Sequence, residues 1–148
     1  MTLSRFRSAA VCAMVLLAAA CSRNDPASFL SSAQSYMQKA DYKAAIVQLK
    51  NAIQAAPENA EARYLLAKAL LETGDPVGAE TEVRKALDLE YSPELAYPLL
   101  ARALYAEGKF QGIVNEIGAV KLETTQGRAV AALTRFWRRC RETSGRLS

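Results

Sequence analysis

Side chains that commonly carry catalysis are sparse in this sequence. It contains no histidine, and its three cysteines (Cys12, Cys21 and Cys140) stand far apart. No cysteine or carboxylate cluster has the spacing of metal ligands, and there is no glycine-rich phosphate loop or GxSxG motif. We therefore expect no enzyme activity, no cofactor and no metal site. The chemistry to look for is binding and lipid attachment.

Cys21 has the clearest candidate chemistry. Arg5 and Arg7 precede an apolar core at residues 9–17, which is shorter than the roughly 20 residues that span a membrane. The run Leu-Ala-Ala-Ala-Cys at 17–21 resembles the bacterial lipobox, whose cysteine is diacylated through sulfur and becomes the mature N-terminus. We expect a lipoprotein signal peptide at 1–20, lipidation of Cys21 and a polar spacer at 21–25. The alternative is an ordinary cleaved signal with a coincidental cysteine. By the same resemblance, Ser22 after the cysteine favours the outer membrane.

Residues after the spacer repeat with a period of 34. Small residues recur as Ala33, Ala67 and Ala101, and larger apolar residues recur as Leu49, Val83 and Ile117. Other recurring sets are Tyr36, Leu70 and Leu104; Ala40, Gly74 and Gly108; Asp41 and Asp75; Ala45 and Ala79; Ala52 and Ala86. A 34-residue period made of two helical halves resembles the tetratricopeptide repeat (TPR). The alternative is an alanine-rich helical bundle without a true repeat.

This pattern predicts an all-α fold, an α-solenoid of three TPR helix-turn-helix repeats at 26–59, 60–93 and 94–127. Helix starts are indicated by Asp25-Pro26, Asp41, Asn59, Asp75-Pro76 and Ser92-Pro93, and helix ends by Pro57, Gly74 and Gly108. We expect helices near 27–39, 43–56, 60–72, 76–89, 93–106 and 110–122. Pro98 should kink the fifth helix or delay its regular start.

Some phrases of the sequence are more specific than the repeat pattern. They are Leu70-Leu71-Glu72-Thr73-Gly74-Asp75-Pro76, Ala79-Glu80, Arg84-Lys85-Ala86-Leu87 and Leu99-Leu100-Ala101-Arg102-Ala103-Leu104. With the lipobox-like run, they resemble the PEP-CTERM/exosortase-associated TPR lipoproteins over residues 10–125. Members of that family are much longer and occur in Gram-negative bacteria that sort envelope proteins and make exopolysaccharide. The resemblance implies the N-terminal part of such a lipoprotein.

The TPR resemblance also implies a concave binding surface on the first helix of each repeat. The family offsets assign to it Gln34, Met37, Gln38, Tyr64, Lys68, Leu71, Arg102 and Tyr105. Tyr64, Lys68 and Leu71 share one stripe of their helix. We expect a protein or peptide ligand in this groove, extended or helical, with an acidic contact. Ordinary solvated surface is the alternative, because the fold requires none of these residues.

The tail at 128–148 departs from the repeat. Residues 126–148 hold six arginines and one glutamate, a net charge of +5, whereas residues 21–125 carry −3. Val130, Leu133, Phe136, Trp137 and Cys140 have helical spacing. Three readings stay open: a helix that caps the third repeat, a basic patch for anionic lipid or nucleic acid, or the end of a truncated or frame-shifted gene, which the abrupt change to arginine favours.

Together these observations predict a non-catalytic scaffold lipoprotein of the bacterial envelope, facing the periplasm from the outer membrane, that mediates protein–protein interactions. Its membrane contact would be the N-terminal lipid, and we expect no nucleic-acid partner. A TPR lipoprotein for outer-membrane or pilus assembly is the main alternative. A second alternative is an electrostatic lipid or nucleic-acid binder led by the Arg-rich tail, whose binding would collapse with added salt.

Lipidation of Cys21 can be tested by metabolic labelling with palmitate. We expect label in the wild-type protein and its loss in Cys21→Ala, because the sulfur is the acylation point. Cys12→Ala should remain labelled if processed normally. Equal labelling of wild type and Cys21→Ala would contradict the prediction.

Overall fold

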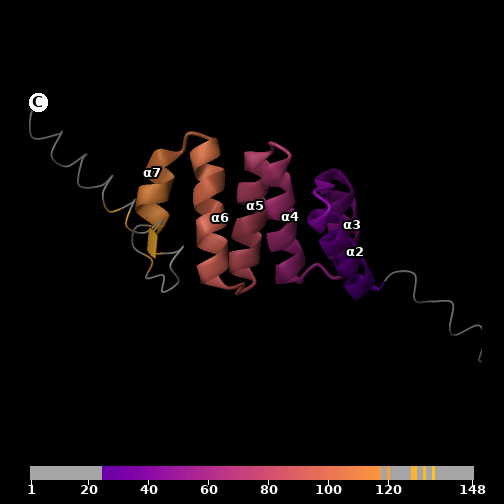
Figure 1. Cartoon of the computed structure of the whole chain (residues 1–148). Coiled ribbons are helices and arrows are strands. Elements are labelled where there is room, and N and C mark those ends of the chain that lie inside the picture. The colour runs from indigo at the N-terminus through magenta and orange to yellow at the C-terminus, as the bar shows by residue number, and fades with distance from the viewer. Residues whose placement is uncertain (1–24, 118–119, 121–127, 130–131, 133–134, 136–148) are drawn as a thin grey trace, which may run out of the picture.

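A computed structural model describes residues 25–117, 120, 128–129, 132 and 135 of the chain. The expected signal peptide, Cys21, spacer residues 21–24 and most of the tail lie outside the described residues. Secondary structure within the described part is helical, and the helices stand side by side in a row (Figure 1). They are α2 Pro26–Gln38, α3 Tyr42–Ala55, α4 Ala60–Glu72, α5 Pro76–Asp88, α6 Pro93–Ala106 and α7 Phe110–Gly112, followed by the π-helix η2 Ile113–Ile117.

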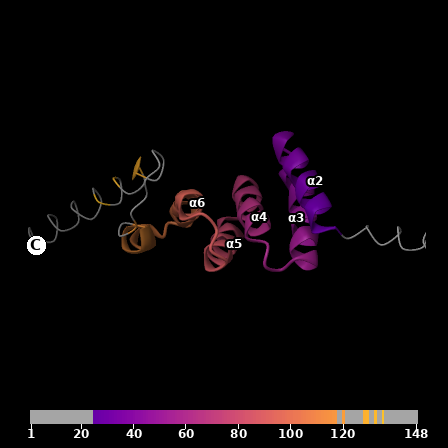
Figure 2. The same ribbon diagram turned by 90° about the horizontal axis from the view of Figure 1, so that it is seen from below.

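The row is a solenoid of helix pairs, as the 34-residue period predicts. The first helices α2, α4 and α6 lie along one side, and α3 and α5 lie along the other (Figure 2). Bounds of the first five helices differ from the expected ones by at most one residue. The chain therefore forms an all-α solenoid.

The third helix pair departs from the pattern in its second helix. We expected one helix over 110–122, whereas α7 is followed by the π-helix η2 from Ile113; residues 118–119 and 121–122 lie outside the described part. Ile113 stands where the earlier pairs have Ala45 and Ala79. In α6, Pro98 is buried inside a helix that begins at Pro93, so the proline does not delay the helix start.

Helix starts are determined by local hydrogen bonds. At four helix starts, a side-chain Oδ1 atom accepts a hydrogen bond of 2.9–3.1 Å from a backbone N–H group two or three residues further on. The four residues are Asp25, Asp41, Asn59 and Asp75. These bonds satisfy donors that have no partner within the first turn. Ser92 differs because its side chain forms no capping bond at the start of α6.

The ends of the first helices are also alike. Ala40, Gly74 and Gly108 adopt positive φ angles of 57°, 84° and 75°. In each case the next N–H donates to a carbonyl five residues back, as in Asp75 N to Leu70 O at 2.9 Å and Lys109 N to Leu104 O at 2.8 Å. This is the Schellman ending, which favours glycine because a Cβ is strained there.

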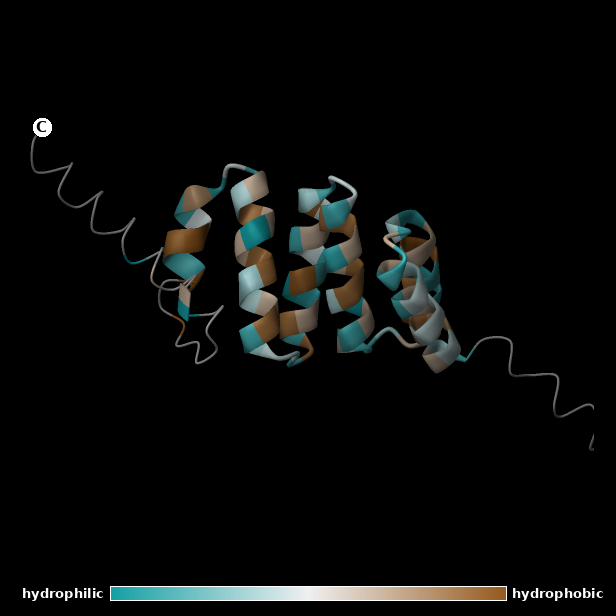
Figure 3. Ribbon diagram, viewed as in Figure 1, coloured by the Kyte–Doolittle hydropathy of each residue, from teal (hydrophilic) through white to brown (hydrophobic). Residues whose placement is uncertain are grey.

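Buried alanines hold the helix pairs together. Ala33, Ala45, Ala52, Ala67, Ala79 and Ala86 are fully buried, and Ala101 is nearly so. Leu49, Val83 and Ile117 are fully buried in the interhelical layer, as expected. Tyr36 and Leu70 are only partly buried, whereas Leu104 is buried. The helices carry hydrophobic and hydrophilic residues on different sides (Figure 3), as amphipathic helices in a row must.

Ion pairs join the second and third helix pairs. Arg84 of α5 contacts Glu80 at 2.9 Å on its own helix and Glu116 of η2 at 2.8 Å. Lys109 lies between α6 and α7 and contacts the other oxygen of Glu80 at 2.6 Å. Its hydrogen bond, together with that from Arg84, lowers the pKa of Glu80 to about 2 against the opposing effect of burial. Glu80 therefore stays ionised over a wide pH range and connects α5 to the next repeat.

Two substitutions test the helix-end geometry in opposite directions. Ala40→Gly should raise the free energy of unfolding by up to about 1 kcal/mol, because it relieves a left-handed alanine. Gly74→Ala should lower it by about 1 kcal/mol; an added Cβ there meets no atom within 4 Å, so only backbone strain contributes. Urea unfolding measures both changes. Stabilisation by Gly74→Ala, or destabilisation by Ala40→Gly, would show that these turns are not left-handed.

Candidate binding face

The eight expected groove residues all lie on α2, α4 and α6, whose shared surface we call the first-helix face. Those exposed to solvent are Gln34, Gln38, Lys68, Arg102 and Tyr105. Those only partly buried, and packed against the two hydrophobic clusters, are Met37, Tyr64 and Leu71. The expected groove therefore contains residues of two kinds, some free to meet a ligand and some also needed for packing.

Polar contacts along this face bridge neighbouring first helices. Gln34 on α2 donates from Nε2 to Glu61 Oε1 on α4 at 3.1 Å. Arg102 on α6 contacts Glu72 Oε1 on α4 at 3.0 Å. These contacts show that the three helices present one connected polar surface. The Arg102 side chain is 55% exposed and that of Glu72 33%, so solvent screens the pair and it contributes little stability, up to about 1 kcal/mol.

A stacked tyrosine pair joins the N-terminal part of α4 to the turn before α6. The rings of Tyr64 and Tyr91 lie 4.7 Å apart between centroids and are inclined by 22°. Burial raises the pKa of the Tyr64 hydroxyl, and the nearby positive charge of Arg102 opposes the shift. Burial likewise raises the pKa of Tyr91, with smaller contributions from Tyr64 and Glu61. Both phenols are neutral at pH 7 and can donate hydrogen bonds.

Tyr91 is a member of this face that sequence reasoning missed. It lies in the turn between α5 and α6, and Pro57 is its counterpart one repeat earlier. Because the repeat offsets assign the groove to first helices only, a turn residue falls outside them. An aromatic residue directly before the Ser92-Pro93 helix start was the only available signal in the sequence.

Lys68 carries a positive charge on this face that no described residue pairs. It is exposed and forms no ion pair with other described residues. It lies four positions after Tyr64, so both side chains lie on one side of α4. Arg102 differs because Glu72 already neutralises part of its charge. A ligand carboxylate would therefore meet Lys68 first.

Tyr105 extends the aromatic surface to the third repeat. Its ring lies 5.5 Å from that of Phe110, edge to face at 73°.

No group of three or more His, Cys, Asp or Glu among the described residues could hold a metal ion. None of the described helices is long and apolar enough to cross a membrane.

Comparison with known proteins agrees with the geometry. Residues 36–103 match the model of the tetratricopeptide repeat family. The chain is 31% identical over 101 residues to a TPR repeat-containing protein of Pseudomonas aeruginosa. The alignment covers 68% of this chain and 41% of the relative, so the chain spans about two fifths of the length of that curated protein.

Substitutions of Tyr64 can separate packing from recognition. Tyr64→Ala should lower the free energy of unfolding by about 2 kcal/mol, because it removes the stack on Tyr91 and part of the packing around α6. Tyr64→Phe keeps the ring and should be within about 0.5 kcal/mol of wild type. Urea unfolding compares the two. Equal losses of unfolding free energy in the two variants would assign the effect to the hydroxyl. No loss in either variant would mean that the Tyr64–Tyr91 stack does not stabilise the fold.

Proposed function

We propose that the chain is a non-catalytic scaffold that binds a protein segment along the first-helix face, because residues 36–103 match the tetratricopeptide repeat model. TPR arrays generally bind protein partners on an extended concave surface. The proposal is carried by the boundary between α4 and α6 on this face, which we call the seam. There, exposed Lys68 lies near the stacked Tyr64–Tyr91 pair. Rigid aromatic area beside a cation is the combination that dominates many protein interfaces.

The ligand class follows from the chemistry of this seam. Tyr64 and Tyr91 offer apolar ring area and phenol hydroxyls, and Lys68 offers a positive charge that is not paired within the described part of the chain. An extended or helical segment with an acidic side chain or a terminal carboxylate would complement them. Arg102 can join this contact by exchanging Glu72 for the ligand, because an exposed ion pair is weak.

The proposed location is the bacterial envelope. In this proposal the chain is anchored by lipid on Cys21 and faces the periplasm, on the outer membrane. Support comes from the basic start, the short apolar core and the lipobox-like run ending at Cys21. The proposal is distinguished from an ordinary exported protein by the palmitate experiment.

The proposed clients are components of exopolysaccharide export or of PEP-CTERM protein sorting. Support comes from the specific phrases at 70–76 and 99–104 and their resemblance to the exosortase-associated TPR lipoproteins. Exosortase or polysaccharide-export genes beside this gene would favour these clients. Pilus genes there would instead favour a scaffold for pilus assembly, which would use the same face.

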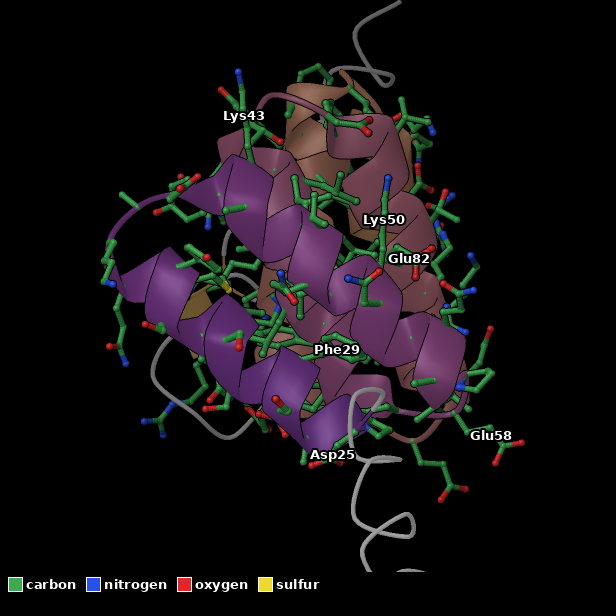
Figure 4. All side chains as sticks on the ribbon, turned by 90° about the vertical axis from the view of Figure 1, so that its right-hand side faces the viewer. Asp25, Phe29, Lys43, Lys50, Glu58 and Glu82 are labelled. Carbon is green, nitrogen blue, oxygen red and sulfur yellow. The ribbon has the colours of Figure 1, made fainter. Side chains whose placement is uncertain are left out.

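Charge reversal on the first-helix face provides the test. The matched pair of variants is Lys68→Glu on α4 and Lys43→Glu on α3; Lys43 is exposed and projects away from the packed helices (Figure 4). Partners are captured by crosslinking from envelope extract and then measured as purified proteins. Lys68→Glu should weaken an acidic partner at least about tenfold, a change of about 1.4 kcal/mol, whereas Lys43→Glu should bind as wild type.

Melting temperatures of both variants should stay close to that of wild type, because exposed lysines contribute little to stability. Retention of every partner by Lys68→Glu would exclude the seam as the binding site. Equal losses in the two variants would indicate a general charge effect instead of a site on α4.

A further inference from the structure

One side of α4 carries charges of opposite sign. Glu61 is exposed in the first turn, and Lys68 is exposed seven positions further along the helix. At 100° per residue, the two side chains leave the helix within about 20° of each other, and about 10.5 Å apart along its axis. Neither residue forms an ion pair with another described residue. A ligand on this side of α4 therefore meets both a negative and a positive charge.

The neighbouring helix α6 continues this division. By the 34-residue offset, Arg102 of α6 is the counterpart of Lys68, and it is exposed with Glu72 as its partner. Leu95 is the counterpart of Glu61 and is 47% exposed. The first-helix face therefore has two levels. One, at Lys68 and Arg102, is basic, and the other, nearer the helix starts, is acidic on α4 and apolar on α6.

The stacked Tyr64–Tyr91 pair is influenced by charges of both signs. Tyr64 stands between Glu61 and Lys68 along α4. Burial is the main cause of the raised pKa of both tyrosine hydroxyls. The positive charge of Arg102 opposes this rise at Tyr64, whereas Tyr64 and the negative charge of Glu61 add to it at Tyr91. The aromatic area therefore lies within reach of an acidic group on one side and a basic group on the other.

Glu61 also has two structural roles, and neither cancels its charge. Its Oε1 accepts a hydrogen bond from Gln34 Nε2 at 3.1 Å, and a carboxylate in the first turn interacts favourably with the helix dipole. The amide is neutral, and a helix N-terminus carries only about half an elementary charge. An exposed carboxylate in this place repels a segment that is acidic throughout and attracts one that also carries a cation.

We propose, resting on the proposed function, that the segment bound at the seam carries charges of both signs around an apolar residue. Its basic side chain pairs with Glu61, its acidic side chain pairs with Lys68, and the apolar side chain between them lies on Tyr64 and Tyr91. In an extended segment, alternate residues face the same side and lie about 6.6 Å apart. The order basic–x–apolar–x–acidic therefore spans about 13 Å. Flexible side chains can match this span to the axial separation of about 10.5 Å between Glu61 and Lys68.

Random dodecapeptides displayed on phage are the probe, because selection reveals the preferred order of residues without a known partner. The full chain should enrich peptides with a basic and an acidic residue on either side of an apolar one. Glu61→Gln should lose the preference for the basic residue and keep that for the acidic one, and Lys68→Gln should do the reverse. The control Glu58→Gln removes the same charge from the exposed turn before α4 (Figure 4) and should select as wild type does.

An enriched peptide is then measured in solution by fluorescence anisotropy. Glu61→Gln in the protein, or neutralisation of the basic residue in the peptide, should each weaken binding about two- to fivefold, as expected for an exposed ion pair. Combining the two changes should weaken binding little further, because both remove the same interaction. Far-UV circular dichroism checks that all variants remain helical.

The possible failures of this proposal and of the proposed function are distinct. Enrichment of acidic peptides without a basic residue, or full additivity of the two losses, would overturn the role of Glu61 and leave the proposed function standing. Selection that is indifferent to Lys68→Gln, or no enrichment over an uncoated surface, would contradict binding at the seam itself and therefore both proposals.

Discussion

Paired helices can pack closely in this protein because alanine occupies the places where their backbones meet. Ala33 with Ala45, and Ala67 with Ala79, are fully buried, and small side chains let ridges of one helix enter grooves of the next. Where Ile113 replaces alanine, the second helix of the third repeat is π-helical. The exposed faces of the solenoid depend on this pairing, because it decides which sides of the helices remain in contact with solvent.

Charged side chains and aromatic rings lie on different outer sides of the solenoid. Along α5, Glu80 and Arg84 form ion pairs that reach Lys109 and Glu116 of the next repeat. Arg63 ties α4 to Glu82 of α5 and donates to the Pro57 carbonyl at the preceding turn. The first-helix face instead carries Tyr64, Tyr105 and the exposed Lys68. Because most charges near α5 are already paired, we propose the first-helix face as the contact surface for an acidic partner.

Residues of the binding face also serve the fold. Leu71 belongs to the proposed groove, yet it packs against the cluster that joins two repeats. Tyr64 similarly supports the α4–α6 seam through its stack on Tyr91. Truncating such residues would weaken both packing and recognition, so exposed Lys68 reports on binding most cleanly. Tyr105, at the equivalent position of the third repeat, is more exposed and contacts the ring of Phe110.

The sequence by itself determined the first five helices and their pairing, because these depend on local causes and on the repeat period; it did not predict the π-helix η2. Asp25, Asp41, Asn59 and Asp75 cap helices with bonds to the next few residues, and the 34-residue period assigns alanines to the contact positions. Tertiary structure alone decided which groove residues are free. The contacts Gln34–Glu61, Arg102–Glu72 and Tyr64–Tyr91 join different helices or a turn. These contacts form only at particular distances and rotations between successive repeats. That geometry results from the packing of many side chains together.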